Sequence, residues 1–328
     1  MRGQQSREAE SPGFDDASWL LIAICGAFLV GFQLTEPFAF SADGAVKSGA
    51  MIGLLWVGSR FYTRLRPRPA LAAILRGMTQ IILFSIGGAI LSYMVAAQGG
   101  ALWDARLQGW DRALGLDWLS YVRWINDHPA IAQLYRWAYV SVIPQLLILV
   151  MALAIAGRPR TMRVIICASI LSGIVAVLTS GLTPAVSNFV YLGLTPADLP
   201  GLDPAAAYVH HDHFVGLRDG SLRLIDIANL EGIITFPSYH AALGAIFVWG
   251  FLRLGPIGWP GAIWAGLMLL ATPVDGAHYF VDVFAGIALA VVALALSPAL
   301  VERRWFEPVG RLIGRREAVP PPPAALPA

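Results

Sequence analysis

Residues 236–299 read FPSYHAALGAIFVWGFLRLGPIGWPGAIWAGLMLLATPVDGAHYFVDVFAGIALAVVALALSPA, three apolar runs joined by short breaks. Each run approaches the ~20 residues that an α-helix needs to cross a bilayer core of ~30 Å. The runs lie at 237–254, 258–274 and 278–299. His240 opens the first run and His278 opens the third. Because the chain crosses down and back between them, the two imidazoles are predicted to meet at one face of the membrane.

The whole chain has the composition of a membrane protein. Of its 328 residues 57% are hydrophobic and 13% are charged, whereas soluble domains carry about 25% charged residues. The mean hydropathy is +0.63. The formal net charge of +2 is too small to indicate a nucleic-acid partner, so the expected surroundings are a lipid bilayer. We therefore predict an all-α fold, a polytopic membrane bundle of about eight transmembrane helices. The other candidate spans lie at 18–35, 46–62, 78–97, 133–156 and 162–184.

The candidate spans divide the chain into three parts. These are a cytoplasmic N-terminal segment at 1–17, an integral membrane domain at 18–299, and a cytoplasmic, partly disordered tail at 300–328. Within the membrane domain, residues 100–120 mix tryptophan and leucine with charges and predict an interfacial helix, with a packed outer loop as the alternative. Residues 185–236 form a long outer loop. Cys25 and Cys167 lie inside apolar runs, so no disulfide is expected.

The distribution of charge predicts which way the bundle faces. Arginine and lysine concentrate on the cytoplasmic side of membrane proteins. With both termini placed inside, the inner segments hold most of the 23 basic residues, whereas most of the 21 acidic residues and all 6 histidines fall outside. The richness in alanine, glycine and arginine indicates a bacterial inner membrane. The predicted active site would then face the periplasm.

The two histidines have neighbours that suit nucleophilic and acid–base chemistry. His278 and Asp282 stand four apart and share one face of a helix. The carboxylate can accept the Nδ1–H of the ring and leave Nε2 free as a nucleophile. His240 is then placed to protonate a leaving oxygen as a general acid. Both histidines open helices whose unpaired N–H groups attract anions, so these features predict a site for a phosphate ester. The alternative for a lone membrane histidine is a hydrogen bond to a neighbouring helix.

A bound phosphate also requires fixed positive charge or hydrogen-bond donors. Arg218 and Arg223 in the outer loop are the candidate clamp, because a guanidinium can donate two parallel bonds to phosphate. Each arginine is equally suited to a salt bridge with Asp219 or Asp226. Ser238 is a candidate donor to a phosphate oxygen, or the cap of its own helix.

The stretch His210-His211-Asp212-His213 has the residue types of a zinc site. Such a short cluster gives poor tetrahedral geometry by itself, so a solvated loop is the favoured interpretation. No metal site is predicted.

Two motifs of the chain resemble those of a known family, the phosphatidic acid phosphatase type 2 superfamily: Phe236-Pro237-Ser238-Tyr239-His240 and, about forty residues later, His278-Tyr279-Phe280-Val281-Asp282. The second motif, followed by Ala285-Gly286, is most similar to the aureobasidin-resistance branch, the inositol phosphorylceramide synthases. The resemblance implies a phosphohistidine mechanism in which His278 attacks phosphorus, Asp282 supports it and His240 protonates the departing group. It also implies that no metal or organic cofactor is needed.

The chain departs from this family in three places. The first motif of the family is a lysine followed by Arg-Pro, whereas neither Arg218 nor Arg223 precedes a proline. Thr272 stands where the third motif has an arginine, and Tyr239 stands where the second has a glycine. These differences favour the synthase-like branch, with a membrane lipid as donor and a polar alcohol as acceptor. Hydrolysis of a lipid phosphate or polyprenyl diphosphate is the close alternative, because both reactions share the covalent step.

Two other classes of protein fit part of this pattern. A proton-coupled transporter would use His278 and Asp282 as a proton relay. The ionisable groups cluster at one face rather than along a path across the membrane, which favours an enzyme. A lipid-binding protein without activity is the third class.

Overall fold

The computed structural model describes residues 16–302. Almost all of the predicted N-terminal segment (1–17) and tail (300–328) lies outside the described residues. The described elements are, in chain order, α1 (Asp16–Thr35), β1 (Ala39–Phe40), α2 (Ala42–Arg64), α3 (Pro69–Ala97), α4 (Asp104–Ala113), α5 (Trp118–Asn126), α6 (Pro129–Val140), α7 (Val142–Ile155), α8 (Pro159–Leu182), α9 (Asn188–Tyr191), α10 (Val209–Asp219), β2 (Leu224–Ile225), the 3-10 turn η1 (Ile227–Asn229), α11 (Tyr239–Leu252), the 3-10 turn η2 (Gly255–Gly258), α12 (Trp259–Asp275) and α13 (Phe280–Glu302).

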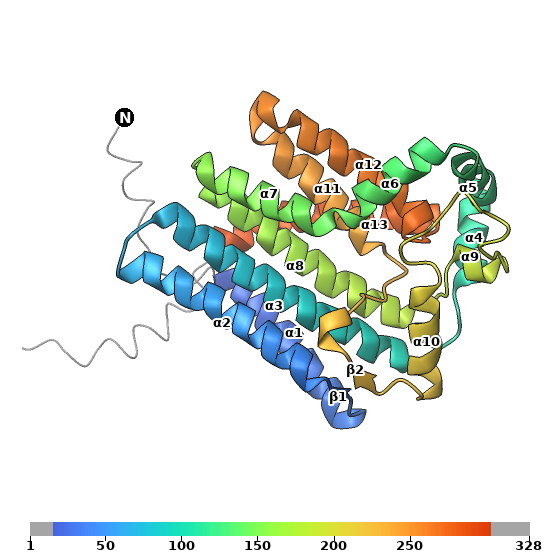
Figure 1. The fold of residues 1–328 in the computed structure, drawn as a ribbon, viewed down its shortest axis with the longest axis horizontal. Coiled ribbons are helices and arrows are strands. Elements are labelled where there is room, and N and C mark those ends of the chain that lie inside the picture. The colour runs from blue at the N-terminus through green and yellow to red at the C-terminus, as the bar shows by residue number, and fades with distance from the viewer. Residues whose placement is uncertain (1–15, 303–328) are drawn as a thin grey trace, which may run out of the picture.

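The long helices form a bundle around a continuous apolar core (Figure 1). α3 packs along α8, and α8 also contacts α11 and α13. Fully buried side chains such as Leu149, Ile165 and Phe247 fill the space between α7, α8 and α11. Cys25 and Cys167 are both buried among the helices. The predicted helical membrane bundle is confirmed in outline.

Five described helices are long and apolar enough to cross a membrane, and six if α6 and α7, which meet at 57°, count as one broken span. The five are Ala17–Thr35, Pro69–Ala97, Pro159–Leu182, Gly255–Asp275 and Phe280–Glu302. The expected count of about eight spans is not confirmed, although each predicted range overlaps a helix. α11 has only 14 residues. α2 carries Asp43 and Lys47 near its start and Arg60 and Arg64 near its end, which lowers its hydropathy.

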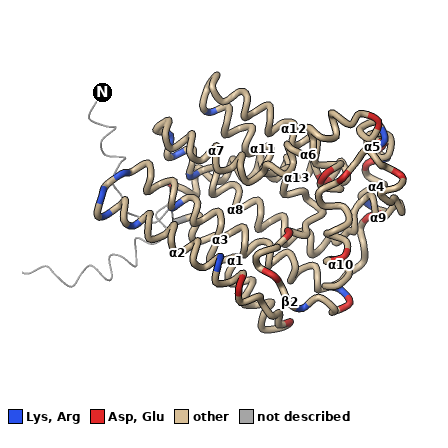
Figure 2. The backbone as a smooth tube through the Cα atoms, in the orientation of Figure 1, with Lys and Arg blue, Asp and Glu red and all other residues tan. Residues whose placement is uncertain are grey.

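A folded cap covers one end of the bundle, built from the predicted interfacial helix 100–120 and outer loop 185–236. α4 and the start of α5 replace the single expected helix. Leu107 and Trp118 are buried within the protein, which agrees with the packed-loop alternative. The outer loop holds α9, α10 and β2, and β2 pairs in parallel with β1. Figure 2 shows acidic residues gathered at this cap, while basic residues mark the turn between α2 and α3 at the opposite end.

α11 and α13 cross in close contact beside Ser238. A Cβ on Gly286 would collide with the carbonyl oxygen of Ser238 and would lie 2.9 Å from the Cβ of Ala241. Because the obstructing atom belongs to the backbone, Gly286→Ala is expected to push the helices apart and to destabilise the fold by about 1–3 kcal/mol. A thermal unfolding scan of the purified protein in detergent measures this loss.

Gly266→Ala is the matched control for this substitution. Gly266 lies in α12 and has nothing within 4 Å of its built Cβ. Since alanine favours a helix over glycine, this variant should keep or raise the unfolding temperature. If Gly286→Ala unfolds at the wild-type temperature, α11 and α13 do not cross closely enough at Ser238 to exclude a Cβ at this position.

Candidate active site

His278 lies directly before α13 and is held by Asp282 in the first turn of that helix. Its Nδ1 lies 3.2 Å from Oδ2 of Asp282, and the same oxygen accepts the N–H of Tyr279 at 2.9 Å. Asp282 is fully buried, and His278 is 4% exposed. Burial lowers the pKa of His278 to about 4, so the ring is neutral at pH 7. This geometry suits an Nδ1–H tautomer, and the ring also lies within hydrogen-bonding reach of the backbone of Thr235.

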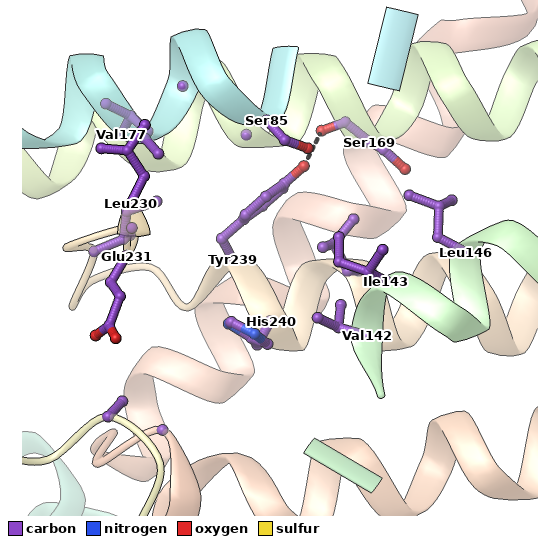
Figure 3. A pocket seen from close by; sticks show the side chains of 18 of the residues that line it. Ser85, Val142, Ile143, Leu146, Ser169, Val177, Leu230, Glu231, Tyr239 and His240 are labelled. Atoms are coloured by element: carbon purple, nitrogen blue, oxygen red, sulfur yellow. Dashed lines mark hydrogen bonds between the residues drawn. The ribbon is translucent and has the colours of Figure 1, made fainter. Parts of the chain in front are cut away.

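His240 lies in the first turn of α11 and stacks on Tyr139 of α6. The two ring centroids are 4.3 Å apart with 19° between the planes, and the Tyr139 hydroxyl lies 3.3 Å from Nδ1 of His240. His240 and His278 line the same cavity, of about 350 Å³. Figure 3 shows His240 beside Tyr239, whose hydroxyl donates to the carbonyl of Ser169 at 3.0 Å. The structure therefore brings the two imidazoles together, whereas their catalytic roles stay predictions.

The cavity has an apolar wall and a polar end. The wall comes from α3, α7 and α8 and includes Ile81, Phe84, Val142, Leu146, Ile170 and Val177. The polar end holds His210, Glu231, His240 and His278. Among the described residues that line the cavity, none is a lysine or an arginine. This lining suits a molecule with an apolar tail and a polar head.

The N-terminus of α13 is already occupied by a carboxylate of the protein. Oδ2 of Asp111 accepts the N–H of Phe280, and Oδ1 accepts that of Val281, both at 2.9 Å. The prediction that unpaired N–H groups of this helix attract the anion is therefore wrong. Ser238 caps α11 by accepting the N–H of Ala241 at 3.3 Å, which agrees with its alternative role as a helix cap.

Asp104 holds the residue that follows His278. Its Oδ1 accepts the hydroxyl of Tyr279 at 2.9 Å and the N–H groups of Val186 and Ser187 at 3.1 Å. Asp104 and Asp111 are only 1% and 2% exposed. Sequence reasoning missed both residues. They stand seven apart on α4, so they share one helix face, and two carboxylates on the buried face of a helix were the signal.

The backbone around His278 adopts a constrained conformation. Ala277 has φ 55°, in the left-handed region that a residue with a side chain seldom occupies. Such a conformation persists only where the surroundings hold it. The side-chain amide of Asn188, which is fully buried, donates to the carbonyl of His278 at 3.3 Å. The bonds from α4 and α9 thus fix the backbone that carries His278.

Asp111→Asn is expected to destabilise the protein. An amide offers a single acceptor oxygen, so one N–H at the start of α13 loses its partner and faces an –NH₂ group. Loss of a hydrogen bond to a charged group costs about 1.5–3 kcal/mol. Thermal unfolding measures the loss. Asp127→Asn at the exposed end of α5 is the control and should unfold at the wild-type temperature. If both variants unfold at the same temperature, Asp111 does not stabilise the start of α13.

The structure places Arg218 and Arg223 outside the cavity lining. Arg218 donates to the carbonyl of Gly100, and Arg223 donates to the carbonyl of Leu217 at 2.9 Å. Each guanidinium also lies over a phenylalanine ring. These contacts tie segments of the cap together and do not bring the arginines to the histidines. Their part in binding phosphate stays a prediction.

The histidine cluster lies on α10, so the solvated-loop interpretation is wrong. Nδ1 of His213 lies 2.9 Å from the hydroxyl of Tyr93, and His210 lines the cavity. Within residues 16–302, no group of three or more His, Cys, Asp or Glu side chains is arranged to hold a metal ion.

The fold and the site together define a helical integral membrane protein with a histidine-based pocket at one end of its bundle. A family model described as the PAP2 superfamily matches residues 105–296, a range that includes His240, His278 and Asp282. The chain belongs to the PAP2 superfamily. Its members are generally phosphatases or phosphotransferases, which supports an enzyme of this broad class. Comparison with curated proteins and with solved structures finds no match.

Proposed function

We propose that the chain is a membrane phosphotransferase or phosphatase that acts on a lipid phosphate ester through a phosphohistidine at His278. One observation carries the proposal: His240 and His278, the latter held by Asp282, line a single cavity whose other wall is apolar. The neutral ring of His278 suits a nucleophile, and its carboxylate partner suits the positive charge that the ring acquires on attack.

The proposed reaction has two displacement steps. Nε2 of His278 attacks phosphorus, the P–N bond forms, and the bond to the leaving oxygen breaks while His240 gives that oxygen a proton. Water or an alcohol then attacks the phosphohistidine, and the P–N electron pair returns to His278. His240 takes the proton of the incoming hydroxyl and is ready for the next cycle.

The substrate class follows from the cavity wall. Side chains of α3, α7 and α8 suit an acyl or isoprenoid chain, and His240 and His278 at the polar end suit the phosphate head. The specific version is headgroup transfer of the inositol phosphorylceramide synthase type, with a polar alcohol as acceptor. Hydrolysis of a lipid phosphate or polyprenyl diphosphate is the alternative.

We place the polar end at the periplasmic face of a bacterial inner membrane, with both termini in the cytoplasm. The charge distribution supports this orientation, because basic residues mark the turn between α2 and α3 and acidic residues gather at the opposite cap. Cysteine labelling of that turn and of the cap in intact cells tests the orientation.

The activity itself is tested with a panel of labelled donors in mixed micelles. Phosphatidic acid, undecaprenyl diphosphate and phosphatidylinositol with ceramide represent the three donor chemistries. The leaving group, inorganic phosphate and any new phospholipid are quantified separately, so that transfer and hydrolysis are distinguished. Release of no leaving group from any donor would contradict the proposal.

A further inference from the structure

His210 and Glu231 form a second polar group in the cavity, beside the catalytic pair. His210 comes from α10, and Glu231 comes from the loop that leads into α11. Nε2 of His210 lies 3.4 Å from Oε2 of Glu231, and the two side chains are 26% and 41% exposed. Both line the cavity that also holds His240 and His278 (Figure 3 labels Glu231 and His240 among the lining side chains). The pair is therefore within reach of both solvent and the reacting groups.

Tyr93 on α3 holds the two halves of this pair together. Its hydroxyl lies 2.9 Å from Nδ1 of His213, one turn beyond His210 on α10. The same hydroxyl accepts the N–H of Glu231 at 3.4 Å. Next to it, Ser92 accepts the N–H of Ile233 at 3.0 Å. The positions of His210 and Glu231 are thus set by the scaffold before any ligand arrives, as a recognition site requires.

The charges of the pair indicate what it can bind. A carboxylate repels a phosphate dianion but accepts hydrogen bonds from hydroxyl groups. Burial lowers the pKa of His210 to about 4, so its ring is neutral at pH 7 and keeps a lone pair for a hydroxyl proton. Nε2 of His210 and Oε2 of Glu231 do not form a hydrogen bond, and Oε2 is buried without a partner among the described residues, so the carboxylate is available to a hydroxyl group. The other titratable groups that line the cavity are Tyr139, Tyr239, His240 and His278.

We infer that His210 and Glu231 form an acceptor subsite, which binds the hydroxyl group of the alcohol that attacks the phosphohistidine. The cavity is then divided: the phosphate lies against His240 and His278, and the incoming polar alcohol lies against His210 and Glu231. This inference rests on the proposed function and adds the residues that bind its second substrate, the hydroxylated acceptor. Because the alcohol is held at the phosphorus, it competes with water for the same phosphohistidine.

The experiment measures how the phosphohistidine partitions. The purified protein is supplied with phosphatidic acid as donor and glycerol as the acceptor probe, and diacylglycerol, glycerol phosphate and inorganic phosphate are quantified. In His210→Ala and Glu231→Gln the ratio of transfer to hydrolysis should fall about tenfold, since each loses a hydrogen bond to the acceptor. The burst of diacylglycerol released in the first turnover, which reports the first step, should change less than about threefold. A merely structural role would lower both steps together.

Two matched controls accompany these variants. His211→Ala changes the neighbouring histidine on α10, which is not among the cavity-lining residues, and should keep the wild-type ratio. Tyr93→Phe removes only the hydroxyl that joins α10 to Glu231 and should give an intermediate ratio. Glu231 is partly exposed, so Glu231→Gln carries the test if His210→Ala does not fold.

The possible results separate the inference from the proposed function. An unchanged ratio in both variants, or formation of inorganic phosphate alone by the wild type at high glycerol, overturns the acceptor subsite and leaves a phosphatase. An equal fall in both steps overturns it as well. If diacylglycerol release is the same in wild type and His278→Ala, the proposed function itself has failed.

Discussion

His278→Ala is expected to abolish turnover while the bundle stays folded. The substitution removes the ring nitrogen that forms the proposed P–N bond. Removal of a covalent nucleophile costs on the order of 10⁴–10⁶ in kcat. His278 lies before α13 and not within it, and the N–H groups at the start of that helix bond to Asp111 rather than to His278. The helix should therefore keep its place.

The measurement combines turnover with trapping of the intermediate. Wild-type protein quenched in alkali should retain labelled phosphate on histidine, and His278→Ala should retain none. His211→Ala, which changes another histidine of the outer cap, is the control for loss of an imidazole alone. Full leaving-group release by purified His278→Ala would end the assignment of the nucleophile.

Asp282→Asn is expected to lower kcat by roughly 10³–10⁴ without unfolding the protein. Both contacts of Asp282 end on Oδ2, so the amide oxygen can keep them, while the –NH₂ group takes the place of Oδ1, which is buried without a partner among the described residues. The variant then lacks the negative charge that stabilises the ring when it becomes positive on attack, and the same substitution in a catalytic triad costs about 10⁴. Removing a buried charge should leave the unfolding temperature unchanged or higher.

The comparison of rate and stability decides the role of Asp282. Steady-state turnover and thermal unfolding are measured on the same detergent preparation. A wild-type rate in Asp282→Asn would show that the carboxylate neither orients nor stabilises the ring. A large fall in unfolding temperature would show that its bond to the Tyr279 N–H is mainly structural.

The helical class and the position of each helix follow from local pattern, because apolar runs long enough to cross a bilayer leave few alternatives. The number of membrane spans is predicted less well by the local sequence pattern. α11 is apolar but short, and α2 is long but carries charges at both ends, so composition and length disagree for these two helices. The folded cap was predicted least well, since its helices α4, α5 and α10 are short and owe their structure to tertiary contacts.

In the candidate site, too, contacts set by spacing along the chain could be predicted, whereas contacts between distant segments could not. The pairing of His278 with Asp282 depends on four-residue spacing, and the meeting of His240 with His278 depends on helices that return to one side. Asp111 reaches its partner Val281 across 170 residues. The pattern of residues within α4 or within α13 does not predict this contact between the two helices. For Arg218, the sequence supplied a suitable residue type but not its actual partner, a backbone carbonyl.

The bonds between α4 and the start of α13 also govern when the protein can become active during synthesis. α4 emerges from the ribosome long before α13. Asp104 can already bond to Val186 and Ser187, but the oxygens of Asp111 find their partners only in Phe280 and Val281. Until α13 is in place, the carboxylate of Asp111 stays hydrated. Nascent chains that end before α13 should therefore expose α4 to protease, and protection should arrive in one late step together with catalytic competence.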